Sequence, residues 1–577
     1  MRPIRISRVM FLAALTVLAA CDQPPPSQPV PPRTVRAHWL SLQDQRIAGE
    51  TALVLPPSAG FQFEQVYVDV EVGPDGRVLS AVPSVDPVFR TLQSKTDPAP
   101  AVTAVKAWRF RPQILGGEPV VTLGTVELIL KRAEKPPDRS VPFPEVDYDD
   151  LEINLVRTAC FGICPDYHVS IRGDGLVRFS TEDYPMLPDV EVIESKTLSR
   201  DVREHLEREA RKARRMYGNS NHVIAPGVHE MPVSADAVRA LVEKFRAASF
   251  FSLKDEYRAD MTDLPTTYVF FRTGRHEKVV IDYGGEMAGM PSSITELADM
   301  IDDLAATDRW VEGNERTLAS LAAEGTDFRS LQALDMALMM AGRGNAYDRS
   351  RGIDGVPDRD IIDMIGLRGL PLDALYAFPE SDKKEVFGHV LLGVAAASGR
   401  EALFRALAAR MPPKPVSQSA LDDWFIKAGC NPGIARALVA AGARPDAGVG
   451  AGTSALLLDY WPVRCAWNEG EMLLAISTLL DLGVPVDAIN ESGQSVLFSS
   501  DSPALTALLI ARGADVNLRA KDGTVPVLAA WDDRVVLLLL QAGADPKVRN
   551  AKGTLRDHAV RNRMVGTLSW LDEHGVK

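Results

Sequence analysis

The sequence predicts a multidomain protein in which two small α+β domains precede an all-α array of helical repeats. Three observations support this prediction. The chain has 577 residues, which is enough for about three to five domains at roughly 100–200 residues each. Apolar residues alternate in short runs between glycine turns before residue 312, a pattern typical of strands. Glycine-marked turns recur at fixed spacing towards the C-terminal end, which is typical of repeats.

Composition and charge exclude several classes of protein. The chain is 46% hydrophobic and 24% charged, as ordinary globular domains are. It carries 64 basic and 77 acidic residues, a formal net charge of −13. This balance argues against a general nucleic-acid binder, because phosphate contacts need a basic field. Five cysteines are too few for a disulfide-rich scaffold.

The N-terminal segment, residues 1–20, has the layout of a signal peptide. A stretch dominated by apolar residues, Val9 to Ala20, follows three arginines: Arg2, Arg5 and Arg8. It is too short to span about 30 Å of hydrocarbon as a helix. The segment ends Leu18-Ala19-Ala20-Cys21, which resembles the lipobox of bacterial lipoproteins. The resemblance implies cleavage before Cys21 and lipid attachment at Cys21. A plain signal peptide followed by a chance cysteine is the alternative.

A lipid anchor would place the mature chain in the bacterial cell envelope, facing the periplasm. Asp22 resembles the inner-membrane retention signal of enterobacterial lipoproteins, so the inner membrane is favoured and the outer membrane stays open. Residues 21–59 are predicted to be the lipidated cysteine and a linker. Six of the twelve residues 22–33 are proline, and proline lacks the N–H that helices and sheets require.

The first globular unit is predicted at residues 60–133. A strand at Gln65–Val72 turns through Gly73–Gly76 into a returning strand at Arg77–Val82, as in a hairpin. A helix is predicted at Pro98–Trp108, and an apolar strand at Val120–Leu130. Together these elements predict a small α+β domain.

The segment Val105-Lys106-Ala107-Trp108-Arg109-Phe110-Arg111-Pro112, with Gly117-Glu118-Pro119-Val120 after it, resembles the C-terminal domain of TonB energy transducers. In that family the domain pairs with a short strand of an outer-membrane transporter, which is a form of strand addition. TonB proteins carry an uncleaved transmembrane helix, whereas this chain has a cleavable signal. A passive docking or structural role is therefore favoured over energy transduction.

The second unit is predicted at residues 146–312, after a linker at residues 134–145 that contains four prolines. The unit is predicted to begin with a strand at Leu151–Arg157. A hairpin follows at His168–Ile171 and Leu176–Phe179, with its turn at Gly173-Asp174-Gly175. Later come a helix at Val233–Ser249, two strands at Thr267–Phe271 and Lys278–Ile281, and a closing helix at Ile294–Leu304.

The pattern C-x-G-x-C-P-x-Y from Cys160 to Tyr167, together with Tyr257 and Thr262–Thr266, resembles a bacterial envelope domain of unknown function. That resemblance supplies no chemistry. Secretion would place Cys160 and Cys164 in an oxidising compartment, so a structural disulfide is the favoured interpretation. A redox-active pair, metal ligands and unpaired thiols remain alternatives. The C-x-x-x-C spacing differs from the C-x-x-C of thioredoxin-like sites.

Two sets of glycine marks recur in phase near the C-terminal end. Gly442, Gly483, Gly513 and Gly543 are 41, 30 and 30 residues apart, and Gly452, Gly493, Gly523 and Gly553 repeat the same spacing. An apolar helix precedes each glycine of the first set. This pattern resembles ankyrin repeats over residues 436–553. Repeats and a capping unit are expected at 436–577, and degenerate repeats or a separate helical segment at 313–435.

The ankyrin resemblance implies protein binding through the hairpin tips and the helix face. The last two tips carry four cations, Arg519, Lys521, Arg549 and Lys552, against the single acid Asp522. In an acidic chain, such a basic edge could select an acidic protein partner. An ordinary solvated loop edge is the alternative.

No catalytic constellation is present in the sequence. It contains no H-E-x-x-H, G-x-S-x-G or Walker A motif, and its histidines form no pair at metal-ligand spacing. No cofactor, metal or nucleic acid is therefore expected. The sequence predicts a membrane-anchored, non-enzymatic scaffold that binds an unknown protein partner. The alternative function is a thiol-disulfide redox protein of the envelope that uses Cys160 and Cys164.

Overall fold

The computed structural model describes most of the chain, and the statements below concern the described residues. These are residues 34–37, 46–49, 52–55, 63–85, 97–115, 118–133, 138–160, 164–181, 222–345, 348, 353–378, 383–410, 415–429, 431–449, 452–457, 469–500 and 502–577. The expected signal peptide and Cys21 lie outside them. Among the described residues, no helix combines the length and apolar composition that crossing a membrane requires.

The N-terminal sheet domain, residues 34–133, is built on a five-stranded sheet. Its order is β1-β9-β4-β5, and β3 also pairs with β9. β4 and β9 are antiparallel over their full overlap, whereas β1 and β3 run parallel to the two ends of β9. The elements are β1 (Thr34–Arg36), β3 (Ala52–Leu55), β4 (Phe63–Val72), β5 (Val78–Pro83), α3 (Ala99–Val105) and β9 (Val121–Arg132).

One face of this sheet is apolar, and helix α3 covers it. Alternation along β4 places Val66, Val68 and Val70 on that face, where they meet Val126, Leu128 and Leu130 of β9. The core also includes Ala101, Val105 and Trp108. Two short strand pairs complete the domain: β2 (Arg46–Ala48) with β6 (Arg109–Phe110), and β7 (Ile114–Leu115) with β8 (Glu118–Pro119).

The hairpin predicted at residues 65–82 is confirmed as β4 and β5, and the predicted C-terminal strand as β9. Two details differ from the predictions. The helix predicted to reach Trp108 ends at Val105, because Trp108 turns into the core. Residues 21–59, predicted as linker, contribute β1, β2 and β3. These strands of three or four residues are too short to show an alternating pattern.

The central domain, residues 146–312, contains a seven-stranded sheet of order β13-β12-β11-β10-β15-β16-β14. Helices α5 (Ala235–Ala247) and α6 (Ser292–Ala305) contribute buried apolar residues to the same core as the sheet. The strands are β10 (Glu152–Arg157), β11 (Tyr167–Arg172), β12 (Leu176–Ser180), β13 (Val228–Pro232), β14 (Glu256–Arg258), β15 (Thr267–Thr273) and β16 (His276–Tyr283). Every strand and helix predicted for this unit is present, with ends shifted by a few residues.

The short helices of the central domain are η1 (Tyr148–Asp150), η3 (Phe250–Ser252), η4 (Gly285–Ala288) and α7 (Asp308–Val311). Eight of the described helices of the following array lie before residue 482. They are α8 (Thr317–Ala323), α9 (Leu331–Gly342), α11 (Asp358–Gly366), α12 (Phe387–Ala397), α13 (Glu401–Ala408), α14 (Gln418–Lys427), α15 (Pro432–Ala440) and α17 (Glu469–Asp481). A short pair, β17 (Leu375–Ala377) and β18 (Lys384–Val386), precedes α12.

The end of the array consists of helix pairs joined by short turns. They are η5 (Val496–Ser499) with α18 (Pro503–Ala511), α19 (Pro526–Ala529) with α20 (Asp533–Gln541), and α21 (Leu555–Arg561) with α22 (Val565–Glu573). A small hairpin of β19 (Arg549–Asn550) and β20 (Gly553–Thr554) projects between α20 and α21. The C-terminal half is therefore a helical repeat region, as the sequence predicts.

The two in-phase glycine marks have a common conformational cause. Gly543 follows α20 with φ of 95°, a left-handed backbone that side chains resist. This geometry lets the N–H of Ala544 bond back to the carbonyl of Leu539 at 2.9 Å. Gly523, with φ of 81°, closes the tip turn by donating to Ala520 at 2.9 Å. One glycine therefore ends each second helix and the other forms each tip.

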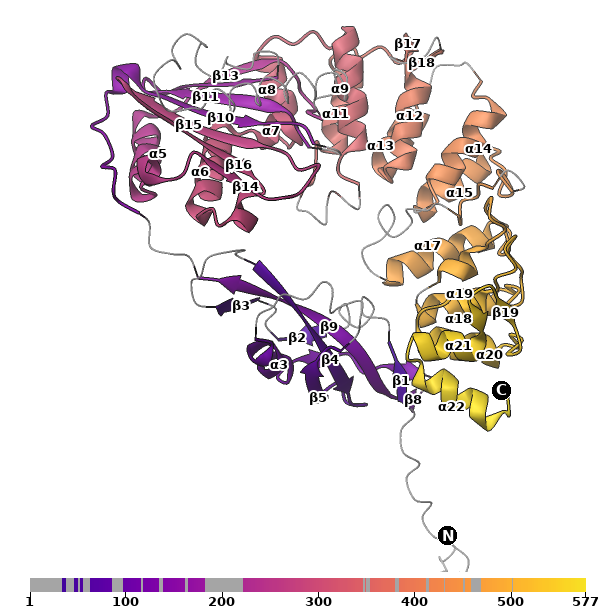
Figure 1. Ribbon diagram of the computed structural model, residues 1–577. Coiled ribbons are helices and arrows are strands. Elements are labelled where there is room, and N and C mark those ends of the chain that lie inside the picture. Colours follow the sequence, from indigo (N-terminus) through magenta and orange to yellow (C-terminus); the bar gives the residue numbers. More distant parts are fainter. Residues whose placement is uncertain are drawn as a thin grey trace, which may run out of the picture.

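The chain bends back on itself, so that its described N-terminal end meets its C-terminal end (Figure 1). The central domain and the array share one continuous apolar core that extends from Leu151 to Leu571. The N-terminal sheet domain has a core of its own. It lies against the last helices of the array, where β1 contacts α20 and α22.

Candidate partner-binding surface of the helical array

The tips of the last repeats form a surface that is built from stacked turns. The N–H of Lys521 donates to the carbonyl of Ser492 at 2.9 Å, which ties one tip to the preceding one. In the next tip, Arg549 pairs with Thr554 across the β19–β20 hairpin. The four predicted partner-binding residues, Arg519, Lys521, Arg549 and Lys552, are all exposed on these two successive tips.

The carboxylates of acidic residues near the tips accept hydrogen bonds from neighbouring residues of the chain. The Asp522 carboxylate accepts the Thr524 N–H at 2.9 Å and its hydroxyl at 3.0 Å. These hydrogen bonds, with a smaller contribution from Lys552, lower the pKa of Asp522. Asp557 likewise accepts the N–H and hydroxyl of Thr554, at 2.8 and 2.9 Å, and its pKa is lowered for the same reason. Both acids are therefore ionised caps directed at local backbone.

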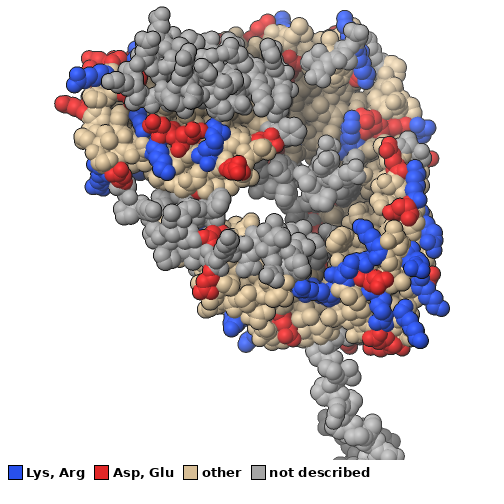
Figure 2. Space-filling view, in the orientation of Figure 1, with Lys and Arg blue, Asp and Glu red and all other residues tan. Residues whose placement is uncertain are grey.

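The cations of the tips have no such partners. Within the described chain, the side chains of Arg519, Lys521, Arg549 and Lys552 form no ion pair or hydrogen bond. Figure 2 shows Lys and Arg gathering over the last helices, towards the lower right of the molecule. Local capping thus occupies the carboxylates and leaves the positive charges facing solvent.

Two further cations belong to this edge, and sequence analysis missed them. Lys547 and Arg561 are exposed beside the β19–β20 hairpin, and Arg561 donates to the carbonyl of Lys552 at 2.7 Å. Lys547 could have been identified from the sequence, because it directly follows the Gly543-Ala544-Asp545-Pro546 turn. Arg561 is at the end of a helix, where its reach to the tip depends on the tertiary fold. We refer to the six residues, Arg519, Lys521, Lys547, Arg549, Lys552 and Arg561, as the tip edge.

The second predicted site is the cysteine pair of the central domain. Cys160 and Cys164 form a disulfide with their Cα atoms 5.5 Å apart. Both residues are partly exposed. The disulfide that the sequence analysis favours for this pair is therefore present.

The tyrosine that ends the cysteine motif anchors the segment to helix α6. The Tyr167 hydroxyl donates to Asp302 at 2.8 Å, and Arg157 donates to the other oxygen of that carboxylate at 2.9 and 2.7 Å. Burial raises the pKa of Tyr167 and also that of Asp302, the latter against the opposing effect of Arg157. The motif thus anchors a loop to the domain core. This structural role accounts for the tyrosine at its end.

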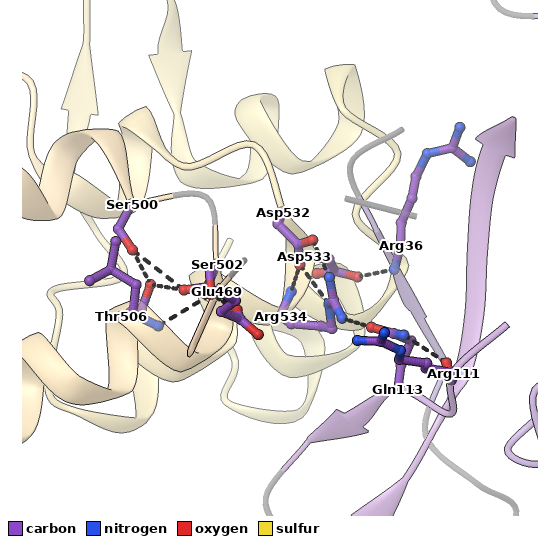
Figure 3. A network of polar contacts seen from close by, with 11 residues as sticks. Arg36, Arg111, Gln113, Glu469, Ser500, Ser502, Thr506, Asp532, Asp533 and Arg534 are labelled. Atoms are coloured by element: carbon purple, nitrogen blue, oxygen red, sulfur yellow. Dashed lines mark hydrogen bonds and ion pairs between the residues drawn. The ribbon is translucent and has the colours of Figure 1, made fainter. Parts of the chain in front are cut away.

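A third cluster, not anticipated from the sequence, joins the two ends of the chain (Figure 3). At its centre the buried Asp533 carboxylate accepts the N–H of Arg36 at 3.1 Å. The same carboxylate accepts the N–H groups of Gly566 and Thr567, each at 2.7 Å, and the Thr567 hydroxyl at 2.6 Å. Burial raises the pKa of Asp533, and these hydrogen bonds oppose the shift.

The neighbouring Arg534 completes this cluster. Its guanidinium binds Asp532 through two nitrogens, at 2.9 and 2.7 Å, and it also donates to the side chain of Gln113. All three side chains are nearly inaccessible to solvent. We call the whole contact, which includes Arg36, Gln113, Asp533, Arg534 and Gly566, the closing contact.

Groups suited to metal binding are not found in the described part of the chain: no three His, Cys, Asp or Glu side chains cluster there in a way that could hold an ion. Cys430 and Cys465 lie outside the described residues.

Comparison with known proteins matches one part of the chain to a family. Residues 151–305 match the model of a domain of unknown function, DUF6438, which covers the central domain and includes the cysteine motif. That match supplies no activity.

Two further similarities concern smaller or weaker matches. The chain is 38% identical over 84 residues to the bovine inactive serine/threonine-protein kinase TEX14, and this stretch covers 14% of the chain and 6% of that protein. The ankyrin repeat domain of Bcl-3, a member of the IkappaB family, covers 39% of the chain and 97% of its own length, at 20% identity and a TM-score of 0.25. The chain thus spans only a small part of the curated relative that it matches.

Proposed function

We propose that this protein is a non-enzymatic scaffold of the bacterial cell envelope, held by a lipid anchor and facing the periplasm, whose ankyrin-type array captures a protein partner. The observation that supports capture most directly is the tip edge. Four of its cations, Arg519, Lys521, Arg549 and Lys552, form no ion pair or side-chain hydrogen bond within the described chain, while the neighbouring acids Asp522 and Asp557 accept hydrogen bonds as caps. Charges left in this state are available to a second molecule, and they would favour an acidic one.

The arrangement of the chain keeps this surface accessible. The N-terminal sheet domain contacts α20 and α22, which are the second helices of their pairs. The tips belong to the turns between successive pairs, and none of the tip-edge side chains contributes to the closing contact. A partner could therefore bind the tips without displacing the N-terminal sheet domain.

Membrane attachment is supported by the sequence alone. The basic residues before Val9, the short apolar stretch and the Leu18–Cys21 lipobox support lipidation at Cys21, with Asp22 favouring the inner membrane. Two or more acyl chains hold a protein on a bilayer far more firmly than one. Metabolic labelling with a fatty acid should mark the wild-type chain and leave a Cys21→Ser variant unlabelled; equal labelling would contradict the anchor.

Partner capture can be tested in cells with a photo-crosslinking amino acid placed at Lys521. The control is the same residue at Arg275, which is exposed in the central domain and has no side-chain partner among the described residues. We expect a protein crosslinked from position 521 and absent from position 275, identified by mass spectrometry. Equal products from the two positions, or none from position 521, would contradict capture by the tip edge.

The alternative function, thiol-disulfide exchange, follows from the partly exposed disulfide between Cys160 and Cys164. An exchange protein needs a disulfide that is readily reduced, with a potential well above about −300 mV. Titration of the full chain against glutathione distinguishes the two functions. The scaffold proposal expects a bond that resists glutathione, and ready reduction would favour the redox alternative.

A further inference from the structure

We propose that the N-terminal sheet domain is a removable cap for the array, docked on the last two helix pairs through strand β1. The occupant of this docking surface is therefore a named part of the same chain, residues 34–37 and the sheet they join. The proposal concerns the closing contact and does not require that the tip edge binds a partner.

The polar half of the contact is specific to the backbone of β1. Asp533 begins helix α20, and its carboxylate holds the N-terminal end of α22 through Gly566 and Thr567. The same carboxylate also accepts the N–H of Arg36 from β1. One side chain therefore joins two helices of the array to the N-terminal strand.

The apolar half of the contact lies beside this polar half. Val35 of β1 is fully buried against Leu537 of α20 and Val120 of its own domain, with Leu538 and Trp570 packed alongside. Close approach of β1 favours glycine at position 566, because a Cβ there would lie only 3.1 Å from the carbonyl oxygen of Thr34 and 3.0 Å from Asp533. The last pair of helices is thus shaped to receive this strand.

Repeat arrays need such a cover at their ends. Each repeat buries its apolar face against a neighbour, so the terminal unit requires a capping surface. From the sequence, the capping unit is predicted within residues 436–577, at the end of the array itself. Helix α22 instead leaves Leu537 and Trp570 to be covered by Val35 and Val120, so part of the cap comes from the opposite end of the chain.

The cap is also attached in a way that permits release. The polar contacts identified between the sheet domain and the array are few: Arg36 and Gln113 bond to Asp533 and Arg534, and Asp69 lies 4.0 Å from Arg563. The remaining connection is the segment 134–145, with its four prolines. Contacts of this limited kind between domains usually allow relative motion.

Two variants of the full chain test the proposal from the N-terminal side, leaving the array sequence unchanged. Val35→Asp puts a carboxylate against Leu537, and Gln113→Lys puts a cation against Arg534. The matched control, Ser80→Asp, introduces the same charge on the exposed strand β5. The radius of gyration from small-angle X-ray scattering reports opening, and amide hydrogen exchange across α20, α21 and α22 reports the stability of the last repeats.

We expect both variants to raise the radius of gyration and to accelerate exchange in α21 and α22 at least tenfold. The amides of β10 and β15 should stay protected, which shows that the central domain remains folded, and Ser80→Asp should behave as wild type. An unchanged radius in both variants would overturn the docking role of this contact. An increased radius with full protection of α21 and α22 would overturn the capping role. Neither readout involves a partner, so the outcome is independent of capture at the tips.

Discussion

At the scale of single residues, one buried cation of the array has a hydrogen-bond acceptor for each of its guanidinium nitrogens. This cation is Arg400, at the start of α13. Its guanidinium donates to Asp358 at 2.6 Å, to the carbonyl of Met340 at 2.6 Å and to the carbonyl of Val356. Met340 belongs to α9, Asp358 begins α11, and Val356 lies just before α11. One side chain therefore fixes the relative positions of three helices.

Removing this guanidinium should destabilise the middle of the array strongly. In Arg400→Met, the Asp358 carboxylate and two buried carbonyls lose their donor. Breaking a buried ion pair in this way lowers the free energy of unfolding by about 3–5 kcal/mol. The matched control is Arg405→Met, because Arg405 forms an exposed pair with Glu401 on the same helix and such pairs contribute about 0–1 kcal/mol. Hydrogen exchange in α9 and α13 measures both effects, and equal acceleration in the two variants would contradict the role of Arg400.

Single residues also show which roles could be predicted from the sequence. The disulfide and the tip cations could be proposed because their partners, or their lack of partners, depend on nearby residues. The role of Arg400 depends on carbonyls up to 60 residues away. That of Asp533 depends on a backbone group 497 residues away. No local pattern marks such residues, although adjacent acids at a helix start do indicate capping.

At the scale of elements, left-handed glycines determine where the second helices of the repeats end. This property made the repeats visible in the sequence, because only glycine adopts that backbone without strain. Short elements left no comparable signal: β1 and β3 lie in a range predicted as linker, and they are ordered by pairing with β9. Elements with a period or a required glycine were therefore predictable, and elements that depend on a distant partner were not.

Substituting such a glycine should lower the free energy of unfolding of the protein. Gly543→Ala places a side chain at φ of 95°, with open space around it, so the cost is backbone strain of about 1–2 kcal/mol. Gly366→Ala is the control, because Gly366 also ends a helix in open space and its φ is not positive. Thermal melts should show a lower transition for Gly543→Ala alone. A neutral Gly543→Ala would show that the turn is not constrained by its glycine.

At the scale of the whole molecule, the central domain and the array are one folded unit. Trp310, between them, is 1% exposed and stacks on His229 of β13 with ring centroids 3.9 Å apart. His229 Nδ1 lies 2.7 Å from a carboxylate oxygen of Glu324, which directly follows α8. The core continues from there into the array, so stability should be shared across this junction.

Truncating Trp310 should therefore affect both sides of the junction. Trp310→Ala removes a buried indole at an expected cost of about 3–5 kcal/mol, and exchange should accelerate in β13 as well as in α8 and α9. Trp531→Ala removes the same side chain where it is 65% exposed and should leave all three elements unchanged. Loss of protection on one side only would indicate two independent units.

The central claim, capture of an acidic partner by the tip edge, is tested most directly by a binding measurement with the partner that position 521 crosslinks. The affinity of wild-type chain is compared with that of Arg519→Glu/Arg549→Glu and with a control of equal charge change, Arg275→Glu/Arg316→Glu, whose side chains are exposed in the central domain and before α8. We predict that the tip variant weakens binding at least tenfold, about 1.4 kcal/mol, and that added salt weakens the wild-type complex. Equal affinity of the tip variant and the control, at low and raised salt, would contradict the claim.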